Sequence, residues 1–293
     1  MNDFDKAARY LIKRDAAGFF RWLLRRDDAA FHLWIDARRL ALPNQSDLTH
    51  DLVASFRVGD GFEALAVELQ SEARPQTLPR LLEYLARLWA EPAAAGSLEL
   101  AGAGGVVLNL TGGGQPAELR LRPTVAPACR LELAVLQRDL RRDAAVDLVA
   151  GVEAERISAW QLAWAPLMQG GAEADILEAW KRAAERLPEP RPRAVLGSIT
   201  LTFANLAQTR PVWDQALRGW NVQTCELWDE IRAEARAEAL QGAISRLGQQ
   251  RFGKAPTKKQ QVALAGISDV GRLERIHDRL LSASSWTDLL ATP

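Results

Sequence analysis

The sequence predicts an α/β fold in which a mixed central sheet is flanked by helices and is followed by a helical extension and a small helical C-terminal unit. Three observations support this prediction. Alternating or continuous apolar runs between residues 51 and 137 are bounded by Gly and Pro turns, which is typical of strands. A strongly amphipathic stretch at 78–91 separates two of these runs and should cover the sheet as a helix. From about residue 139 onward, helical periodicity replaces the strand pattern.

Helix and strand patterns follow one another closely in the first part of the chain. Apolar residues at helical spacing predict one amphipathic helix over 4–25, and the segment 31–42 is compatible with either a strand or a helix. Two strands are expected at 51–58 and 62–70, because a Gly-Asp-Gly turn joins them into a hairpin. The helix at 78–91 comes next, with a proline in its first turn, where proline is tolerated.

The remaining chain is divided between a few strands and many helices. The almost wholly apolar run at 105–110 predicts a buried central strand, and two further strands are expected at 117–123 and 130–137. A Pro-rich linker is expected at 188–193. Helices are expected, in chain order, at 143–152, 155–168, 173–187, 226–250, 258–267 and 270–283. These patterns divide the chain into an α/β core (1–138), a helical extension (139–222) and a C-terminal helical domain (223–293).

Composition excludes several classes of protein. Lys+Arg and Asp+Glu both number 37, so any affinity for nucleic acid must come from local basic patches. Cys129 and Cys225 lie far apart without CxxC spacing, which excludes a disulfide scaffold and a cysteine zinc site. The sequence has neither a signal-peptide pattern nor an apolar run of about 18 residues. A cytoplasmic protein without a membrane span is therefore expected.

The hairpin at 51–70 brings three polar side chains to one face. Side chains alternate along a strand, so Glu68 and Gln70 share a face, and Asp51 lies on one face of the preceding strand. A two-residue turn at Gly59-Asp60 places Asp51 opposite Glu68, whereas a turn at Asp60-Gly61 places it opposite Gln70. In both registers the three polar side chains point to the same side.

This arrangement of side chains favours a metal ion. Directly opposed residues lie roughly 4.5–5.5 Å apart at Cα, and two carboxylates at that spacing repel unless one is protonated or a cation lies between them. Oxygen ligands without nearby Cys or His suit Mg²⁺ or Mn²⁺. From the residues alone, the alternative that Asp51 and Glu68 are solvated strand residues stays open.

The motif around the hairpin resembles a known family. The pattern D-L-V-A-S-F…G…A-V-E-L-Q-S…L-P-R-L-L-E-Y-L-A-R-L resembles the PD-(D/E)XK nuclease superfamily, in particular its recombination-promoting and transposase-like branch. The segments FDKAARYL, GVVLNLTG, WAPLMQGG and SRLGQQRFGKAP are also similar to that branch, so the resemblance covers most of the chain. It implies a restriction-endonuclease-like sheet and a metal-dependent endonuclease that hydrolyses DNA phosphodiester bonds in a recombination- or transposon-related role.

The resemblance also implies roles for individual residues. Asp51 and Glu68 match the metal-binding carboxylates for Mg²⁺ or Mn²⁺. Gln70 occupies the position of the superfamily's lysine, and a glutamine cannot act as a base, so it would orient the attacking water or a ligand. Asp5 matches the acidic residue that often completes the site, although a charge favoured by the helix macrodipole explains it equally well.

Two residues of the covering helix belong to the same prediction. The resemblance places Arg80 near a phosphate and Tyr84 near a carboxylate, and their spacing of four puts them on one helix face. A surface arginine and a tyrosine at the edge of the core are the alternatives. Two further functions stay open: a catalytically inactive nuclease fold that binds DNA or protein, and a homo-oligomer that pairs through the C-terminal helices.

Overall fold

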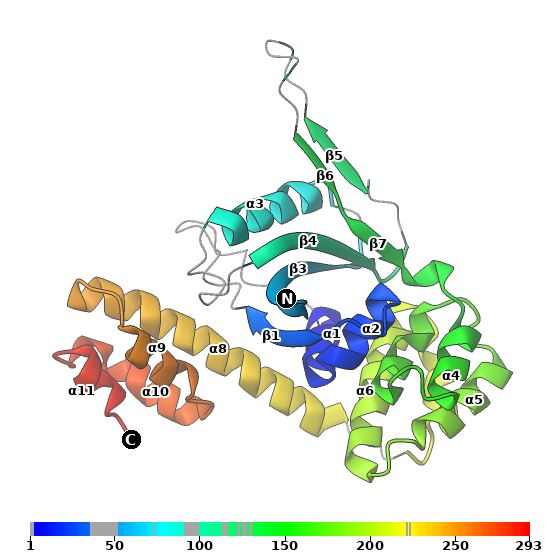
Figure 1. Ribbon diagram of the computed structural model, residues 1–293. Coiled ribbons are helices and arrows are strands. Elements are labelled where there is room, and N and C mark those ends of the chain that lie inside the picture. The colour runs from blue at the N-terminus through cyan, green and yellow to red at the C-terminus, as the bar shows by residue number, and fades with distance from the viewer. Residues whose placement is uncertain are drawn as a thin grey trace. The chain divides into compact units, whose positions relative to one another are not determined.

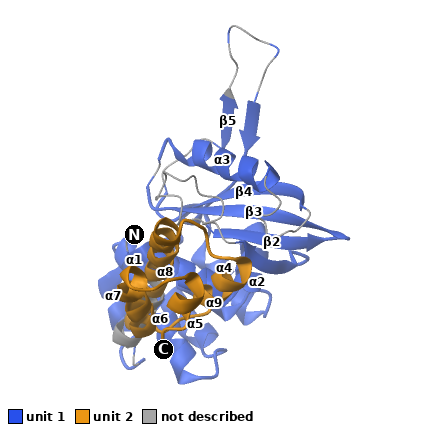
Figure 2. Ribbon diagram, turned by 90° about the vertical axis from the view of Figure 1, so that its left-hand side faces the viewer, with its two compact units in different colours: residues 1–222 blue, residues 223–293 orange. Residues whose placement is uncertain are grey.

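The computed structural model describes residues 3–35, 52–72, 74–90, 100–112, 117–121, 124, 128, 131–220, 222 and 224–293. The chain divides into two compact units, residues 1–222 and 223–293, which Figure 2 shows in different colours. Each unit is described by itself.

A mixed five-stranded sheet forms the centre of the first unit. Its strands lie in the order β1 (Phe31–Ile35), β2 (Leu52–Val58), β3 (Gly61–Gln70), β4 (Leu100–Asn109) and β7 (Leu136–Asp139). The first three strands pair antiparallel, whereas β3, β4 and β7 run parallel. The predicted mixed sheet flanked by helices is therefore confirmed, and all but the last residue of the apolar run at 105–110 lies in the buried end of β4, an interior strand between β3 and β7.

Helices cover both faces of this sheet (Figure 1). On one face lies α3 (Thr77–Ala90), whose buried side chains Leu81 and Tyr84 pack on Ala64 and Ala66 of β3. The other face is covered from the N-terminal side, where the ring of Phe20 meets that of Phe56 of β2 at 4.8 Å between centroids. Because both faces of the sheet are covered, polar side chains that point from β3 toward α3 must find partners there.

The prediction of one helix over 4–25 is wrong, because the chain forms two helices there. These are α1 (Asp3–Arg14) and α2 (Ala16–Leu24). Asp15 between them leaves the helical conformation, with φ −138° and ψ 61°. Its carboxylate accepts a hydrogen bond from the backbone N–H of Gly18 at 3.1 Å and so caps the start of α2.

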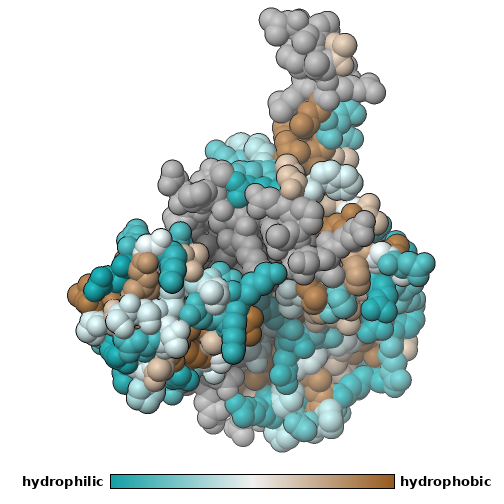
Figure 3. All heavy atoms as spheres, turned by 60° about the vertical axis from the view of Figure 1, so that its left-hand side comes forward, coloured by the Kyte–Doolittle hydropathy of each residue, from teal (hydrophilic) through white to brown (hydrophobic). Residues whose placement is uncertain are grey.

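The prediction of one strand over 130–137 is also wrong. The segment divides at Val135 into β6 (Leu131–Ala134) and β7, which belong to different sheets. Strand β6 pairs antiparallel with β5 (Glu118–Leu121) in a two-stranded arm that projects from the sheet (Figure 1). Apolar side chains gather on this arm in Figure 3, where Leu131 is exposed.

Helices fill the remainder of the first unit. They are η3 (Leu140–Arg142), α4 (Ala145–Glu153), η4 (Ala159–Leu167), α5 (Ala174–Ala184), α6 (Pro190–Leu206) and α7 (Arg210–Ala216). Two predictions need correction here. The segment 155–168 contains a 3₁₀-helix rather than an α-helix, and the expected linker 188–193 instead begins α6, because prolines in a first turn lack only an N–H that would have no helical partner.

An aromatic core joins these helices to the N-terminal ones. The indole of Trp164 in η4 stacks on Trp22 of α2 at 6.0 Å and on Phe203 of α6 at 4.7 Å. All three side chains are buried. The helical extension expected at 139–222 therefore shares a core with the N-terminal helices and lies in the same compact unit as the sheet.

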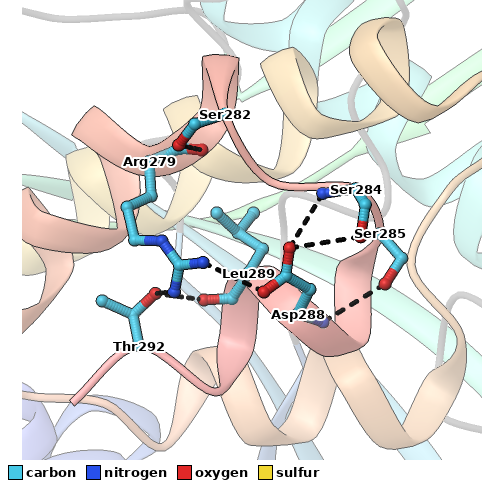
Figure 4. Close-up of polar contacts among 7 residues, drawn as sticks. All are labelled: Arg279, Ser282, Ser284, Ser285, Asp288, Leu289 and Thr292. Atoms are coloured by element: carbon cyan, nitrogen blue, oxygen red, sulfur yellow. Dashed lines mark hydrogen bonds and ion pairs between the residues drawn. The ribbon is translucent and has the colours of Figure 1, made fainter.

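The second unit is helical throughout. It contains α8 (Thr224–Phe252), α9 (Lys258–Ala265), α10 (Val270–Asp278), η5 (Arg279–Leu281) and α11 (Trp286–Leu290). Its core includes Ile244, Leu273 and Trp286. Near the C-terminus Asp288 accepts a hydrogen bond from the backbone N–H of Ser284 at 2.9 Å and pairs with Arg279 at 3.0 Å (Figure 4). Of all the helices in the described ranges, none is long and apolar enough to cross a membrane.

Candidate functional site

The turn of the β2–β3 hairpin decides between the two registers that the sequence leaves open. Val58 pairs with Gly61, so the loop consists of Gly59 and Asp60, and Gly59 adopts φ +58°, a value that favours glycine. At the other end of the hairpin Leu52 pairs with Val67. Asp51, the residue directly before β2, lies outside the described residues.

Glu68 and Gln70 both point toward α3, on the face that Ala64 and Ala66 share. Their side chains are buried: Glu68 is 7% exposed and Gln70 4%. A buried carboxylate is costly unless a charge or hydrogen-bond donors compensate it. Because both side chains face α3, residues of this helix are placed to supply such partners.

Two residues of α3 contact this pair. Arg80 Nη2 lies 3.6 Å from Glu68 Oε1, and Gln70 Nε2 donates a hydrogen bond to Thr77 Oγ1. Thr77 begins the helix and Arg80 lies one turn further along. The N-terminal turn of α3 therefore lies over the carboxyl end of β3, where the helix macrodipole also favours negative charge.

The oxygen of the Gln70 side-chain amide, unlike its nitrogen, is not hydrogen-bonded within the described part of the chain. This oxygen, Oε1, is buried. Such an orphaned acceptor costs about 1–3 kcal/mol, and in native proteins it marks strain, a catalytic role, an ordered water or a bound ion.

Further polar residues continue from Gln70 across the carboxyl edge of the parallel strands. Gln70 is in register with Asn109 at the end of β4, and Asn109 with Asp139 at the end of β7. Neighbouring residues in a parallel register share a face, and Asn109 is 5% exposed. The carboxylate of Asp139 accepts a hydrogen bond from the backbone N–H of Arg141 at 3.0 Å, which caps η3. The carboxyl edge of such strands is the usual place for a ligand in α/β sheets.

Sequence reasoning missed Thr77, Asn109 and Asp139. A single polar residue at the end of the apolar run GVVLNL is a signal for Asn109. No local pattern reveals the contact of Thr77 or the alignment of Asp139, because both depend on how distant segments pack.

Tyr84 and Asp5 are the other predicted site residues that lie in the described part of the chain. Tyr84 is 1% exposed and packs in the apolar core beneath α3, beside Leu81 and Leu88. Asp5 lies in the first turn of α1, where the macrodipole favours a carboxylate. Within the described ranges no three His, Cys, Asp or Glu side chains form a group that could hold a metal ion. A metal site at Glu68 therefore needs amide oxygens or a carboxylate such as Asp51 from outside those ranges.

The donors at this edge fit a hard divalent cation. Glu68 offers a carboxylate, and Gln70 offers a buried amide oxygen with free lone pairs. Magnesium and manganese prefer oxygen ligands of these kinds. In the structure, Arg80 supplies positive charge to the buried carboxylate of Glu68.

An open cavity of about 570 Å³ lies near the end of β4. Its walls include Leu110 and Thr111, which follow β4, and Leu167 and Gly171, at the end of η4 and beyond it. None of Glu68, Gln70, Thr77 and Arg80 is among the residues that line it. This cavity is therefore separate from the pair formed by Glu68 and Gln70.

Comparisons of the chain with models of known protein families, with curated proteins and with solved structures find no match in any of the three.

Proposed function

We propose that the protein is a divalent-metal-dependent phosphodiesterase whose active site lies at the carboxyl end of β3. More particularly, we propose a DNA endonuclease of the PD-(D/E)XK kind, with a restriction-endonuclease-like sheet and a role in recombination or transposition. The observation that carries this proposal is the pair Glu68 and Gln70, which are buried on the same face of β3 as Ala64 and Ala66, at the end of the strand.

The hairpin register supports a second carboxylate at this place. Leu52 pairs with Val67, so one further step of the same register would set residue 51 opposite Glu68. Directly opposed residues in an antiparallel pair lie roughly 4.5–5.5 Å apart at Cα. We therefore expect Asp51 and Glu68 to hold Mg²⁺ or Mn²⁺ between their carboxylates.

The residues of the chain divide the work of phosphodiester hydrolysis. A bound divalent cation supplies Lewis acidity and lowers the pKa of a water molecule. Glu68 and Asp51 would hold this cation. Arg80, whose side chain is 29% exposed, can reach a phosphate oxygen of the substrate from its position beside Glu68. Gln70 cannot accept a proton in the way a lysine base would, so its role would be to orient the attacking water or a ligand.

A second candidate function is a nuclease fold that binds DNA or a protein without cleavage. Two observations favour it. Gln70 stands where a base would be useful, and the contacts of Thr77 and Arg80 with β3 also serve to fasten α3 to the sheet. If this second function is correct, the pairs Gln70–Thr77 and Glu68–Arg80 serve to hold α3 on the sheet.

Plasmid cleavage by the purified full-length chain distinguishes the two functions. Wild type is compared with Asp51→Asn, Glu68→Gln and Glu63→Gln in Mg²⁺, in Mn²⁺ and in EDTA. Glu63 is the matched control, because it is an exposed glutamate on the same strand β3. We expect metal-dependent cleavage by wild type and Glu63→Gln, and loss of cleavage in the other two variants.

Two outcomes contradict the proposal. Equal cleavage by wild type and Glu68→Gln places the activity elsewhere or in a contaminant. Mn²⁺ binding without cleavage of supercoiled, linear or single-stranded DNA favours the second candidate function.

A further inference from the structure

The side-chain amide of Gln70 is held at one end only. Its Nε2 donates to the hydroxyl of Thr77, and both residues are almost fully buried, at 4% and 1% exposure. A glutamine amide carries donors at the nitrogen and two acceptor lone pairs at the oxygen. With the nitrogen fixed on Thr77, the oxygen is turned away from that hydroxyl, and it has no hydrogen-bond partner in the described ranges.

The opposite orientation of the amide would also bond to Thr77. The hydroxyl of Thr77 can donate as well as accept, so a rotated amide would present Oε1 to Thr77 and turn Nε2 to the place that Oε1 now occupies. The two orientations differ in what they present to the neighbouring carboxylate of Glu68. The rotated amide would offer it a donor, whereas the observed amide leaves a second acceptor in the same buried region.

Two oxygen acceptors in one buried region are unfavourable without a positive partner. Glu68 and Gln70 are two residues apart on one face, or roughly 6.6 Å along the strand. Side chains of this length can converge on a cation that binds oxygen at about 2.0–2.6 Å. Arg80 neutralises Glu68, whereas no residue in the described ranges donates a hydrogen bond to Gln70 Oε1.

We propose that Gln70 Oε1 is an oxygen ligand of the divalent cation bound at Glu68, and that Thr77 is the positioning residue that keeps this oxygen toward the cation. The inference rests on the proposed metal site and adds to it a neutral ligand and its support. Thr77 is suited to the task, because it begins α3 and its backbone N–H donates to Arg74 O at 3.1 Å, which fixes the start of the helix. Residues that orient metal ligands typically change metal affinity by about 10–100-fold.

Mn²⁺ titration of the full-length protein without DNA, followed by electron paramagnetic resonance, tests the inference. The variants are Thr77→Val, which removes the hydroxyl, Thr77→Ser, which retains it, and Thr200→Val as the matched control. Thr200 is also a buried threonine whose hydroxyl donates a hydrogen bond, to Leu196 O at 2.8 Å in α6. Circular dichroism establishes that each variant is folded.

We expect Thr77→Val to weaken Mn²⁺ binding by about 10–100-fold, Thr77→Ser to restore it, and Thr200→Val to leave it unchanged. If Thr77→Val fails to fold, Gln70→Met decides: binding weakened to a similar degree supports the assigned ligand, and binding as in wild type overturns it. Wild-type affinity in folded Thr77→Val, together with weakened binding in Glu68→Gln, overturns the role of Thr77 and leaves the metal site standing. Absence of Mn²⁺ binding in wild type overturns the metal site and this inference together.

Discussion

Arg80 on α3 lies 3.6 Å from Glu68 on β3, so a positive partner of this buried carboxylate comes from a helix that the chain places over the sheet. In the proposed nuclease, the guanidinium and a divalent cation would be alternative partners of the Glu68 carboxylate. A cation bound there would leave Arg80 available to a phosphate group, which is the role that the proposed nuclease requires.

Replacing Arg80 by Gln should have two opposite effects. The free energy of unfolding in EDTA should fall by about 1–3 kcal/mol, because Glu68 loses the charged contact with Arg80. Mn²⁺ affinity should rise, because the competing positive charge is gone. Urea unfolding and Mn²⁺ titration measure the two quantities. Arg87→Gln is the control, because Arg87 pairs with Glu83 at 3.7 Å on the same helix, and a loss of stability equal to that control would contradict the prediction.

Arg138 of β7 should contribute strongly to stability. Its Nε contacts Asp143 at 2.6 Å, its Nη1 donates to Trp22 O at 2.5 Å, and its guanidinium lies 4.0 Å from the centroid of the Trp22 ring. Burial lowers the pKa of Arg138, while the hydrogen bond that Arg138 donates to Asp143 opposes that shift. Arg138→Met should reduce the free energy of unfolding by about 1.5–3 kcal/mol.

Arg142→Met is the control for Arg138, since the Arg142 side chain is 85% exposed and pairs with Asp139 only at 3.7 Å. This control should change stability by less than about 0.5 kcal/mol in chemical denaturation. Similar effects of the two variants would show that the contacts of Arg138 with α2 add little.

Gly112 should resist substitution for two separable reasons. Its φ is +78°, and a Cβ atom there would lie 3.0 Å from Arg141 Cδ. Gly219 has φ +86° with nothing within 4 Å of the same position, so Gly219→Ala measures the backbone strain alone. We expect Gly219→Ala to cost about 1–2 kcal/mol and Gly112→Ala to cost more, because Arg141 must also move. Thermal unfolding of both variants tests this order.

Stability of the second unit should depend on pH through Asp288. The N–H of Ser284, first, and the side chain of Arg279 lower the pKa of Asp288 below its ordinary value of 3.8. A carboxyl whose pKa is lower in the folded state stabilises that state above its unfolded pKa and loses the effect as pH falls through the folded value. Wild type should therefore exceed Asp288→Asn in stability near pH 7, and the difference should shrink below pH 3.8.

Chemical denaturation of the full chain at several pH values, followed by a probe in the second unit such as Trp286 fluorescence, measures this difference. Asp278→Asn is the control, because the side chain of Asp278 is 83% exposed. An advantage of wild type over Asp288→Asn that is the same at pH 3 and pH 7 would be contrary to the assigned contacts.

Several elements could be predicted because their causes are local. The β2–β3 hairpin follows from period-two alternation and a glycine that accepts φ +58°, and the shared face of Glu68 and Gln70 follows from the same alternation. The helix over Thr77–Ala90 follows from apolar residues at helical spacing. The break at Asp15 was missed because a capping side chain interrupts a periodicity that continues on both sides.

What the sequence by itself determined is the hairpin and the side to which its polar residues point, since both arise from neighbouring residues. Only the tertiary structure decided what meets them. The contact of Thr77 with Gln70, the distance of Arg80 from Glu68 and the row from Gln70 through Asn109 to Asp139 depend on how α3 and the parallel strands pack. The physical reason is that residues far apart in a chain become neighbours through burial of apolar surface, which favours contact in general, while register and shape select the particular pairs.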